Sequence, residues 1–178
     1  MKAQKIASTG ILAAMICVLS PFSIPAGTIP VSLATFAIYI TACTVKTKIS
    51  VSAVIIYILL GAMGLPVFSS FQGGFHILTG VTGGYIIGYI PCTIIIGLLV
   101  NRFEDKKFIY AVSLVLGTVA CYAIGTLWYM IQTNSNFVSA ISVCILPFII
   151  GDIIKISAAS ALGFVLRKRI AGYKKTRS

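Results

Sequence analysis

The sequence predicts an all-α integral membrane protein: six transmembrane helices with the N- and C-termini in the cytoplasm. Three observations lead to this prediction. Hydrophobic residues make up 58% of the 178 positions and charged residues only 10%, whereas a soluble domain carries about 25% charged residues. Apolar runs recur along the whole chain, with a mean hydropathy of +1.05, and a membrane span needs roughly 20 such residues. Basic residues fall in alternate connections between the runs, which indicates an orientation.

Six apolar runs define the expected spans of a single transmembrane domain. They cover about residues 6–20, 30–45, 49–64, 82–100, 108–131 and 146–167. Gly64 and Pro66 end the third run. The first run follows Lys2 and Lys5 and therefore resembles a signal peptide, but the further spans behind it favour an uncleaved first helix.

The start of the sixth span depends on Pro147. Proline fits best in the first turn of a helix, so we expect this span to begin near Leu146. Residues 137–145 then form a short helical piece of an outer loop. The alternative is one long helix from Phe137 that is kinked at the proline.

The basic residues give the topology. They precede the first span, join the second to the third and the fourth to the fifth, and continue from Arg167, at the end of the sixth, into a basic tail at 168–178. Of 14 Lys and Arg, all but Lys155 lie in these places, which the positive-inside rule assigns to the cytoplasm. The net charge of +11 is thus explained by topology, and basic clusters without interleaved aromatic residues do not favour nucleic-acid binding.

The chain lacks the sequence motifs of several functional classes. The five cysteines lie in apolar runs without the close spacing of a disulfide framework or a zinc site. No P-loop occurs, so energy from ATP would have to come from a partner. We predict no cofactor, no metal and no catalytic residues. A small intramembrane enzyme would have to use Asp152 and His76, the only conceivable acid–base pair in the outer half.

Asp152 and Lys155 are charged residues inside an expected span. They are three positions apart and therefore share one face of a helix. A charge in a span is costly unless it faces protein or water, and by default it marks a functional site. The alternative is a purely structural pair in which each residue neutralises the other.

Residues 65–81 connect the third and fourth spans and form a Gly-rich outer loop. This loop contains Gln72 and His76, but no carboxylate, Lys or Arg. A loop this apolar is expected to fold back as a lid over a cavity and to bind a solute through neutral hydrogen bonds. Gly73 and Gly74 belong to the expected site; turn formation and tight helix packing are their structural alternative.

Gly10 and Ala14 give the first span a small-xxx-small pattern. This spacing lets a second helix approach closely. We expect a surface for a partner helix, although the same pattern would also serve packing inside this chain.

Five segments, in this order, carry a resemblance to a known family. They are IPVSLATF (29–36), LGAMGLPVF (60–68), QGG (72–74), TGVTGGY (79–85) and Pro147-x-x-x-Gly-Asp-x-x-Lys155. On six spans they are similar to the BioY family, the biotin-binding S-components of energy-coupling-factor (ECF) vitamin transporters, and the resemblance covers essentially the whole chain. It implies a bundle like other ECF S-components in a bacterial-type cell membrane. It also implies a pocket near the outer surface under the first and third outer loops, and docking of the first helix on a transmembrane coupling subunit driven by two cytoplasmic ATPases.

The resemblance also suggests roles in binding biotin. Asp152 would accept hydrogen bonds from the ureido N–H groups, and such charge-assisted bonds are about twice as strong as neutral ones. Gln72 would bond the ureido carbonyl, and Lys155 would attract the carboxylate or compensate Asp152. The expected site residues are Asp152, Gln72, Lys155, Tyr85, Gly73, Gly74 and His76, with Phe71, Phe75 and Trp128 as further apolar wall.

The chain departs from the family pattern at three positions. Members often carry Asn at Gln72, some carry Arg at Ile86, and many carry Gln at Ala34, so the contact to the carboxylate is the least defined. Lys155 or His76 would take it over, or the tail stays near solvent. The alternative functions are an S-component for riboflavin or thiamine, an intramembrane enzyme, a slow facilitator acting alone, and a scaffold without a ligand.

Overall fold

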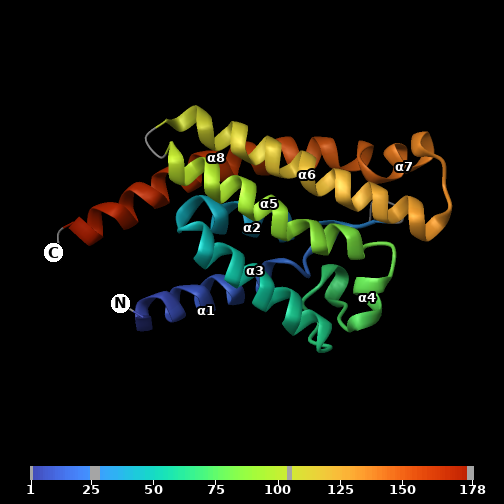
Figure 1. Cartoon of the computed structure of the whole chain (residues 1–178), viewed down its shortest axis with the longest axis horizontal. Coiled ribbons are helices and arrows are strands. Elements are labelled where there is room, and N and C mark those ends of the chain that lie inside the picture. Colours follow the sequence, from blue (N-terminus) through green and yellow to red (C-terminus); the bar gives the residue numbers. More distant parts are fainter. Residues whose placement is uncertain (1, 25–28, 104–105, 176–178) are drawn as a thin grey trace.

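The computed structural model describes residues 2–24, 29–103 and 106–175, and its helices run roughly along one long axis (Figure 1). For Lys2 and residues 171–175 it describes the backbone alone. Glu104 and Asp105, which the sequence analysis placed in a cytoplasmic loop, and the last three residues of the predicted tail lie outside the described residues.

The described part of the chain is mostly helical, as the all-α prediction requires. Its helices are α1 Lys2–Leu19, α2 Ala34–Thr44, α3 Thr47–Ala62, α4 Phe75–Thr79, α5 Gly83–Arg102, α6 Lys107–Thr133, α7 Phe137–Cys144 and α8 Leu146–Lys175. A 3₁₀ turn, η1 Ser69–Phe71, precedes α4, and a two-stranded hairpin, β1 Ser23–Ile24 and β2 Val31–Ser32, precedes α2.

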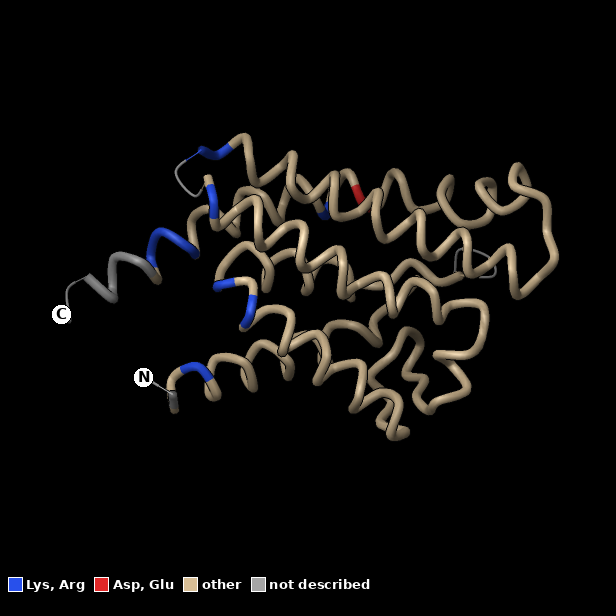
Figure 2. The backbone as a smooth tube through the Cα atoms, viewed as in Figure 1, with Lys and Arg blue, Asp and Glu red and all other residues tan. Residues whose placement is uncertain are grey.

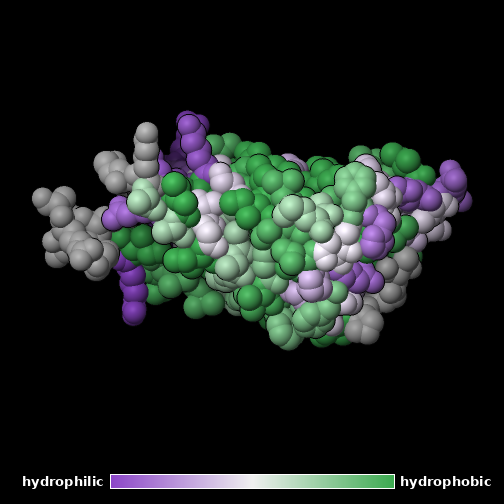
Figure 3. Space-filling view, turned by 90° about the horizontal axis from the view of Figure 1, so that it is seen from below, coloured by the Kyte–Doolittle hydropathy of each residue, from purple (hydrophilic) through white to green (hydrophobic). Residues whose placement is uncertain are grey.

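Three helices are long and apolar enough to cross a membrane by length and composition, namely α5, α6 and residues 146–170 of α8. Residues 3–19 of α1, together with α2 and α3, are shorter apolar helices. Large apolar side chains such as Ile150 and Ile154 are exposed on the outside of the bundle. On the face shown in Figure 3, a hydrophobic band separates two polar ends. A continuous exposed apolar surface of this kind fits a lipid environment.

The second helix differs from its predicted range of 30–45, because it begins at Ala34. The preceding residues form β2, which pairs antiparallel with β1 through Ser23–Ser32 and Ile24–Val31. Ser32 Oγ then accepts a hydrogen bond from the Ala34 amide at 3.2 Å. At 1.5 Å per residue, α2 is about 16 Å long, roughly half the thickness of a hydrocarbon core.

A break at Ile145 (φ −122°) separates α7 from α8. Pro147 therefore lies in the first turn of α8, where its missing N–H costs no helical hydrogen bond. α8 continues beyond residue 167 into the segment predicted as a tail. Arg167 donates to the Cys43 carbonyl (3.2 Å) and to Asn101 Oδ1 (2.6 Å), so this part of α8 is attached to the ends of α2 and α5.

Close packing of α5 on α6 depends on glycine. A Cβ on Gly125 would lie 2.6 Å from the Tyr85 ring, and a Cβ on Gly84 would lie 2.2 Å from Trp128 Cβ. The Tyr85 hydroxyl also donates to the Cys144 carbonyl at 2.7 Å, which connects α5 to α7. These contacts fix Tyr85 against its neighbours.

The charges are distributed very unevenly along the long axis (Figure 2). Most of the basic residues lie at the end where both termini are found, which we call the basic end. α4 and α7 lie at the opposite end, which we call the lid end (Figure 1). Asp152 and Lys155 lie in the first half of α8 (Leu146–Lys175).

Candidate ligand-binding site

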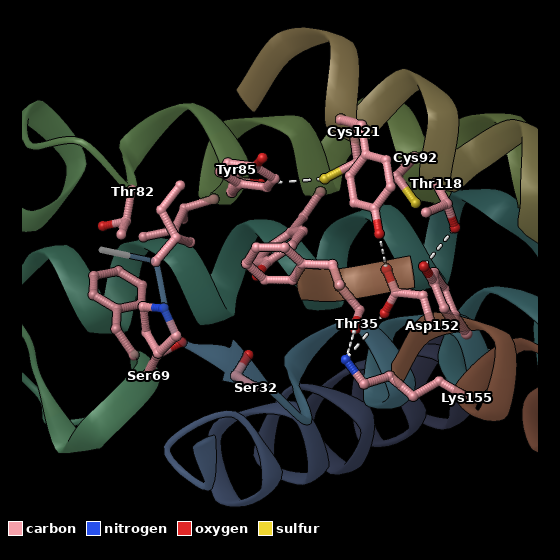
Figure 4. Close-up of a pocket in the computed structure, with 18 of the residues that line it drawn as sticks. Ser32, Thr35, Ser69, Thr82, Tyr85, Cys92, Thr118, Cys121, Asp152 and Lys155 are labelled. Atoms are coloured by element: carbon pink, nitrogen blue, oxygen red, sulfur yellow. Dashed lines mark hydrogen bonds and ion pairs between the residues drawn. The ribbon is translucent and has the colours of Figure 1, made fainter. Parts of the chain in front are cut away.

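A cavity lies among α2, α3, α5, α6 and α8, beneath the lid segment (residues 65–81) (Figure 4). Aromatic side chains form much of its wall, among them Tyr39, Tyr57, Phe68, Tyr85, Tyr122 and Phe148. The lining is otherwise apolar with a few hydroxyl, amide and charged groups. A mostly apolar cavity with a few placed polar groups is the usual form of a small-molecule site.

Asp152 and Lys155 form the floor of this cavity. They are 4% and 9% exposed, and Lys155 Nζ lies 3.1 Å from Asp152 Oδ1. Lys155 also donates to Thr35 Oγ1 at 3.1 Å, while the Tyr122 hydroxyl donates to Asp152 Oδ2. The two residues thus neutralise each other and also line the cavity. A structural pair and a functional site, the two interpretations of the sequence pattern, therefore do not exclude each other.

These bonds join three helices around one ion pair. Thr35 comes from α2, Tyr122 from α6, and the ion pair from α8. A buried ion pair needs such additional hydrogen bonds, because desolvation of two charges costs several kcal/mol per ion. With both oxygens of Asp152 already held, its orientation in the cavity is fixed before any ligand arrives.

Thr35 and Tyr122 were not among the site residues predicted from the sequence. Both are part-buried residues of apolar helices, where threonine and tyrosine are common for reasons of packing alone. Thr35 lies within the 29–36 motif, which was the only available signal. Tyr122 lies 30 positions before Asp152, and no periodicity connects the two.

Tyr85, a predicted wall residue, lines the cavity. Its ring stacks on Phe148 with centroids 6.0 Å apart and an interplanar angle of 19°. Tyr122 meets the Tyr85 ring edge-on at 6.5 Å. The three rings form a continuous aromatic wall above the ion pair.

The first half of the lid segment is held by α3 and by the β1–β2 hairpin. Phe68 is 1% exposed, packs edge-on against Tyr57 with centroids 5.6 Å apart, and fits because Gly61 has no side chain. The Ser70 amide donates to the Pro21 carbonyl at 3.0 Å, and the hydroxyls of Ser23 and Ser70 lie 2.9 Å apart. The hairpin and the lid segment thus close the cavity together.

The second half of the lid segment is held by α6. Trp128 Nε1 donates to the Gly80 carbonyl at 2.9 Å, and Gln132 Nε2 donates to the Thr79 carbonyl at 2.5 Å. Both acceptors are backbone atoms, so they fix the position of the lid without requiring particular side chains in it. Trp128 therefore fastens the lid and does not line the cavity.

Of the predicted site residues, the cavity is lined by four, namely Asp152, Lys155, Gln72 and Tyr85. Gly73, Gly74 and His76 are not among its lining residues. Phe71 and Phe75, two predicted wall residues, are 60% and 67% exposed and do not line it either.

The two glycines instead shape the lid segment. A Cβ on Gly73 would lie 2.2 Å from the Leu65 carbonyl oxygen. Gly74 has φ +110°, which side chains disfavour, and its amide donates to the Gly61 carbonyl at 2.7 Å. His76 is exposed on α4.

Gly10 and Ala14 lie away from the cavity, on the outside of α1. Both are exposed, and a Cβ on Gly10 would meet nothing within 4 Å. The neighbouring side chains of Ile6, Ile11 and Val18 are exposed as well. Gly10 and Ala14 therefore do not serve packing within the described part of this chain, whereas the neighbouring Ala13 is buried in the core.

Comparison with known proteins identifies the family. The sequence profile described as "BioY family" matches residues 1–172. The chain belongs to the BioY family. This BioY-family protein is 38% identical to the biotin transporter BioY of Thermotoga maritima, over 93% of this chain and 96% of that protein. It is 31% identical to the biotin transporter BioY2 of Lactococcus lactis subsp. cremoris, over 89% and 87%.

A solved structure supports the fold of this BioY-family chain. It is described as the S-component for biotin from an ECF-type ABC transporter, and it superposes with a TM-score of 0.87 at 24% identity, over 94% of this chain and 92% of that one. The predicted all-α membrane fold of the S-component type is therefore confirmed. The resemblance to the BioY family, which implied a bundle of the S-component type, is confirmed as well.

Proposed function

We propose that this membrane protein is the substrate-capture subunit, or S-component, of a biotin transporter of the ECF type, and that it has no enzymatic activity. The observation that carries the proposal is the Asp152–Lys155 pair on the floor of an aromatic cavity. The names of the relatives support biotin as the ligand. These names give no support to riboflavin or thiamine as the ligand, nor to a function as an enzyme or as a scaffold.

The chemistry of the floor suits the ureido ring of biotin. A carboxylate has about four lone-pair sites, and Lys155 and Tyr122 occupy one on each oxygen of Asp152. The remaining sites accept the ureido N–H groups. Gln72, which lines the cavity from the lid segment, bonds the ureido carbonyl or the ring edge, and the wall of Tyr85 and Phe148 contacts the thioether ring.

Gly73 and Gly74 contribute to binding through the lid segment. The two glycines allow its close approach to the end of α3, so that Gln72 reaches the cavity. Opening of this segment admits the ligand, and its closure keeps water away from the floor of the cavity. His76, exposed on α4, makes no contact with the bound molecule.

The orientation follows from charge. We assign spans to α1, α2, α3, α5, α6 and α8, place the basic end and both termini in the cytoplasm, and place the lid end outside. The positive-inside rule supports this assignment, because the connections at the lid end contain no Lys or Arg. The cavity then opens toward the outer surface of the cell membrane.

Delivery across the membrane requires partners. The exposed Gly10–Ala14 surface of α1 would dock on a transmembrane coupling subunit, and two cytoplasmic ATPase subunits would drive it. Gly10→Leu should abolish co-purification with the coupling subunit and leave biotin binding intact. Loss of biotin binding in this variant would instead assign Gly10 to the fold of the chain.

A titration of the purified full-length protein with biotin tests the binding role. We expect a Kd in about the nanomolar range, and no binding of riboflavin or thiamine. Asp152→Asn should weaken biotin binding about 10- to 100-fold, because it replaces charge-assisted hydrogen bonds with neutral ones. Binding no tighter than micromolar, or an Asp152→Asn variant with unchanged affinity, would contradict the proposal.

A further inference from the structure

The outer half of the chain contains no cation that is available to a ligand. The sequence has no Lys or Arg between Lys5 and Lys46, between Lys48 and Arg102, or between Lys107 and Lys155. These three stretches include the hairpin, the lid segment and α7. Among the residues that the structure describes, Lys155 is the only Lys or Arg that lines the cavity.

Lys155 is already engaged. Its Nζ lies 3.1 Å from both Asp152 Oδ1 and Thr35 Oγ1. The cavity lining contains one acid and one base, bonded to each other, and is neutral overall. A second carboxylate brought to Lys155 would also meet the negative charge of Asp152.

The opposite end of the cavity is polar but uncharged. Figure 4 shows Ser69 and Thr82 far from the ion pair, on the lid side. Gln72, which also lines the cavity, is exposed, whereas Asp152 is 4% exposed. The cavity therefore opens at the lid end. His76 is not among the lining residues.

Biotin carries a carboxylate at the end of its tail. Burying an ionised carboxylate without a cation costs several kcal/mol, whereas leaving it in water costs nothing. The opening between Ser69, Gln72 and Thr82 is uncharged. It lets the carboxylate stay in water, and it offers no cation that would stabilise a buried carboxylate.

We infer that the cavity recognises the ureido and thioether rings of biotin and leaves the tail carboxylate at the lid end, in water and without a cation. The inference rests on the proposed function and defines its ligand class: biotin together with derivatives whose tail is neutral. The methyl ester and the primary amide of biotin should bind nearly as well as biotin itself.

Calorimetric titration of the purified full-length protein with biotin, biotin methyl ester and biotinamide tests this inference. We expect the three Kd values to agree within about threefold, the range of an exposed charge. A carboxylate held by a buried cation would instead lose about 30-fold or more on esterification. If biotin binds and both derivatives are weaker by more than about tenfold, the inference fails and the proposed function stands. If biotin does not bind, both fail.

Two variants locate the carboxylate. Ser69→Lys brings an ammonium group to the lid end and should favour biotin over its methyl ester by about threefold. An unchanged ratio would place the carboxylate elsewhere and overturn the inference. His76→Ala should leave the ratio unchanged. A lower preference for biotin in this variant would identify His76 as the partner of the carboxylate and would likewise overturn it.

Discussion

The floor and the lid of the cavity are built in different ways. On the floor, side chains from three helices bond to the carboxylate of Asp152 and to Lys155, and the two charged residues are at most 9% exposed. In the lid segment, most of the bonds end on backbone atoms, at Gly61, Thr79, Gly80 and Pro21. Large side chains such as Phe71 are exposed there.

The difference implies that the floor determines which ligand binds, whereas the lid determines how the ligand enters and leaves. The floor is pre-arranged by particular functional groups, so exchanging any of them changes what the cavity binds. The lid is positioned by the path of its backbone, so its glycines matter more than its exposed side chains. Substitutions on the floor should therefore change equilibrium affinity, whereas substitutions in the lid should change how fast the ligand leaves.

The largest effect is expected from Lys155→Met. It leaves Asp152 as a buried carboxylate without its cation, which should destabilise the fold by about 3–5 kcal/mol. Thermal unfolding in detergent measures this loss. The double variant Asp152→Asn/Lys155→Met should recover stability but not biotin binding; a double variant as unstable as the single one would show that the charges are not the cause.

Tyr122→Phe should come next. The variant removes a hydrogen bond to Asp152 Oδ2 and frees the carboxylate to rotate, so the Kd for biotin should rise about tenfold. Melting temperature should change little. Tyr129→Phe, in the same helix and outside the cavity lining, is the matched control, and an equal loss of affinity in both variants would argue against a specific role for Tyr122.

In the lid segment, Gly73→Ala should release biotin about five- to tenfold faster. The added Cβ would meet the Leu65 carbonyl, and overpacking of this kind costs at least about 1 kcal/mol. A stopped-flow chase with excess unlabelled biotin gives the rate. Gly80→Ala, whose Cβ would lie 3.2 Å from the His76 carbonyl, should have a smaller effect. A larger effect of Gly80→Ala than of Gly73→Ala would contradict the proposal that close packing at Gly73 holds the lid segment in place.

The smallest effect is expected from Gln132→Ala, which removes one bond between α6 and the lid segment. The dissociation rate should rise about two- to fivefold, in line with a single neutral hydrogen bond. The same chase experiment detects it. A large fall in equilibrium affinity without faster release would contradict the proposal that the lid controls the rate of release and the floor the affinity.

The sequence was sufficient for the features that depend on composition and on charge. Apolar runs and helix breakers predicted the all-α class, and two charged residues three positions apart in a span identified the floor of the cavity. Both signals come from strong free-energy costs, namely the cost of exposing apolar surface and that of burying a charge. Such costs leave a pattern in a single sequence.

Features that depend on the packing of distant segments left no such pattern. Tyr122 and Thr35 are bound to the ion pair through contacts across 30 and 120 positions. Trp128 was predicted as cavity wall, but its indole N–H bonds the lid backbone. The first residues expected in the second span form β2, because pairing with β1 competes there with helix formation.

The position of Asp152 and Lys155 on a single helix bears on biogenesis. A helix with one unpaired charge is expensive to transfer from the translocon into lipid. In α8 the acid and the base lie one turn apart, so the segment carries its own counterion during insertion. The two charges can therefore enter the bilayer together, before Thr35 and Tyr122 are in place to receive them.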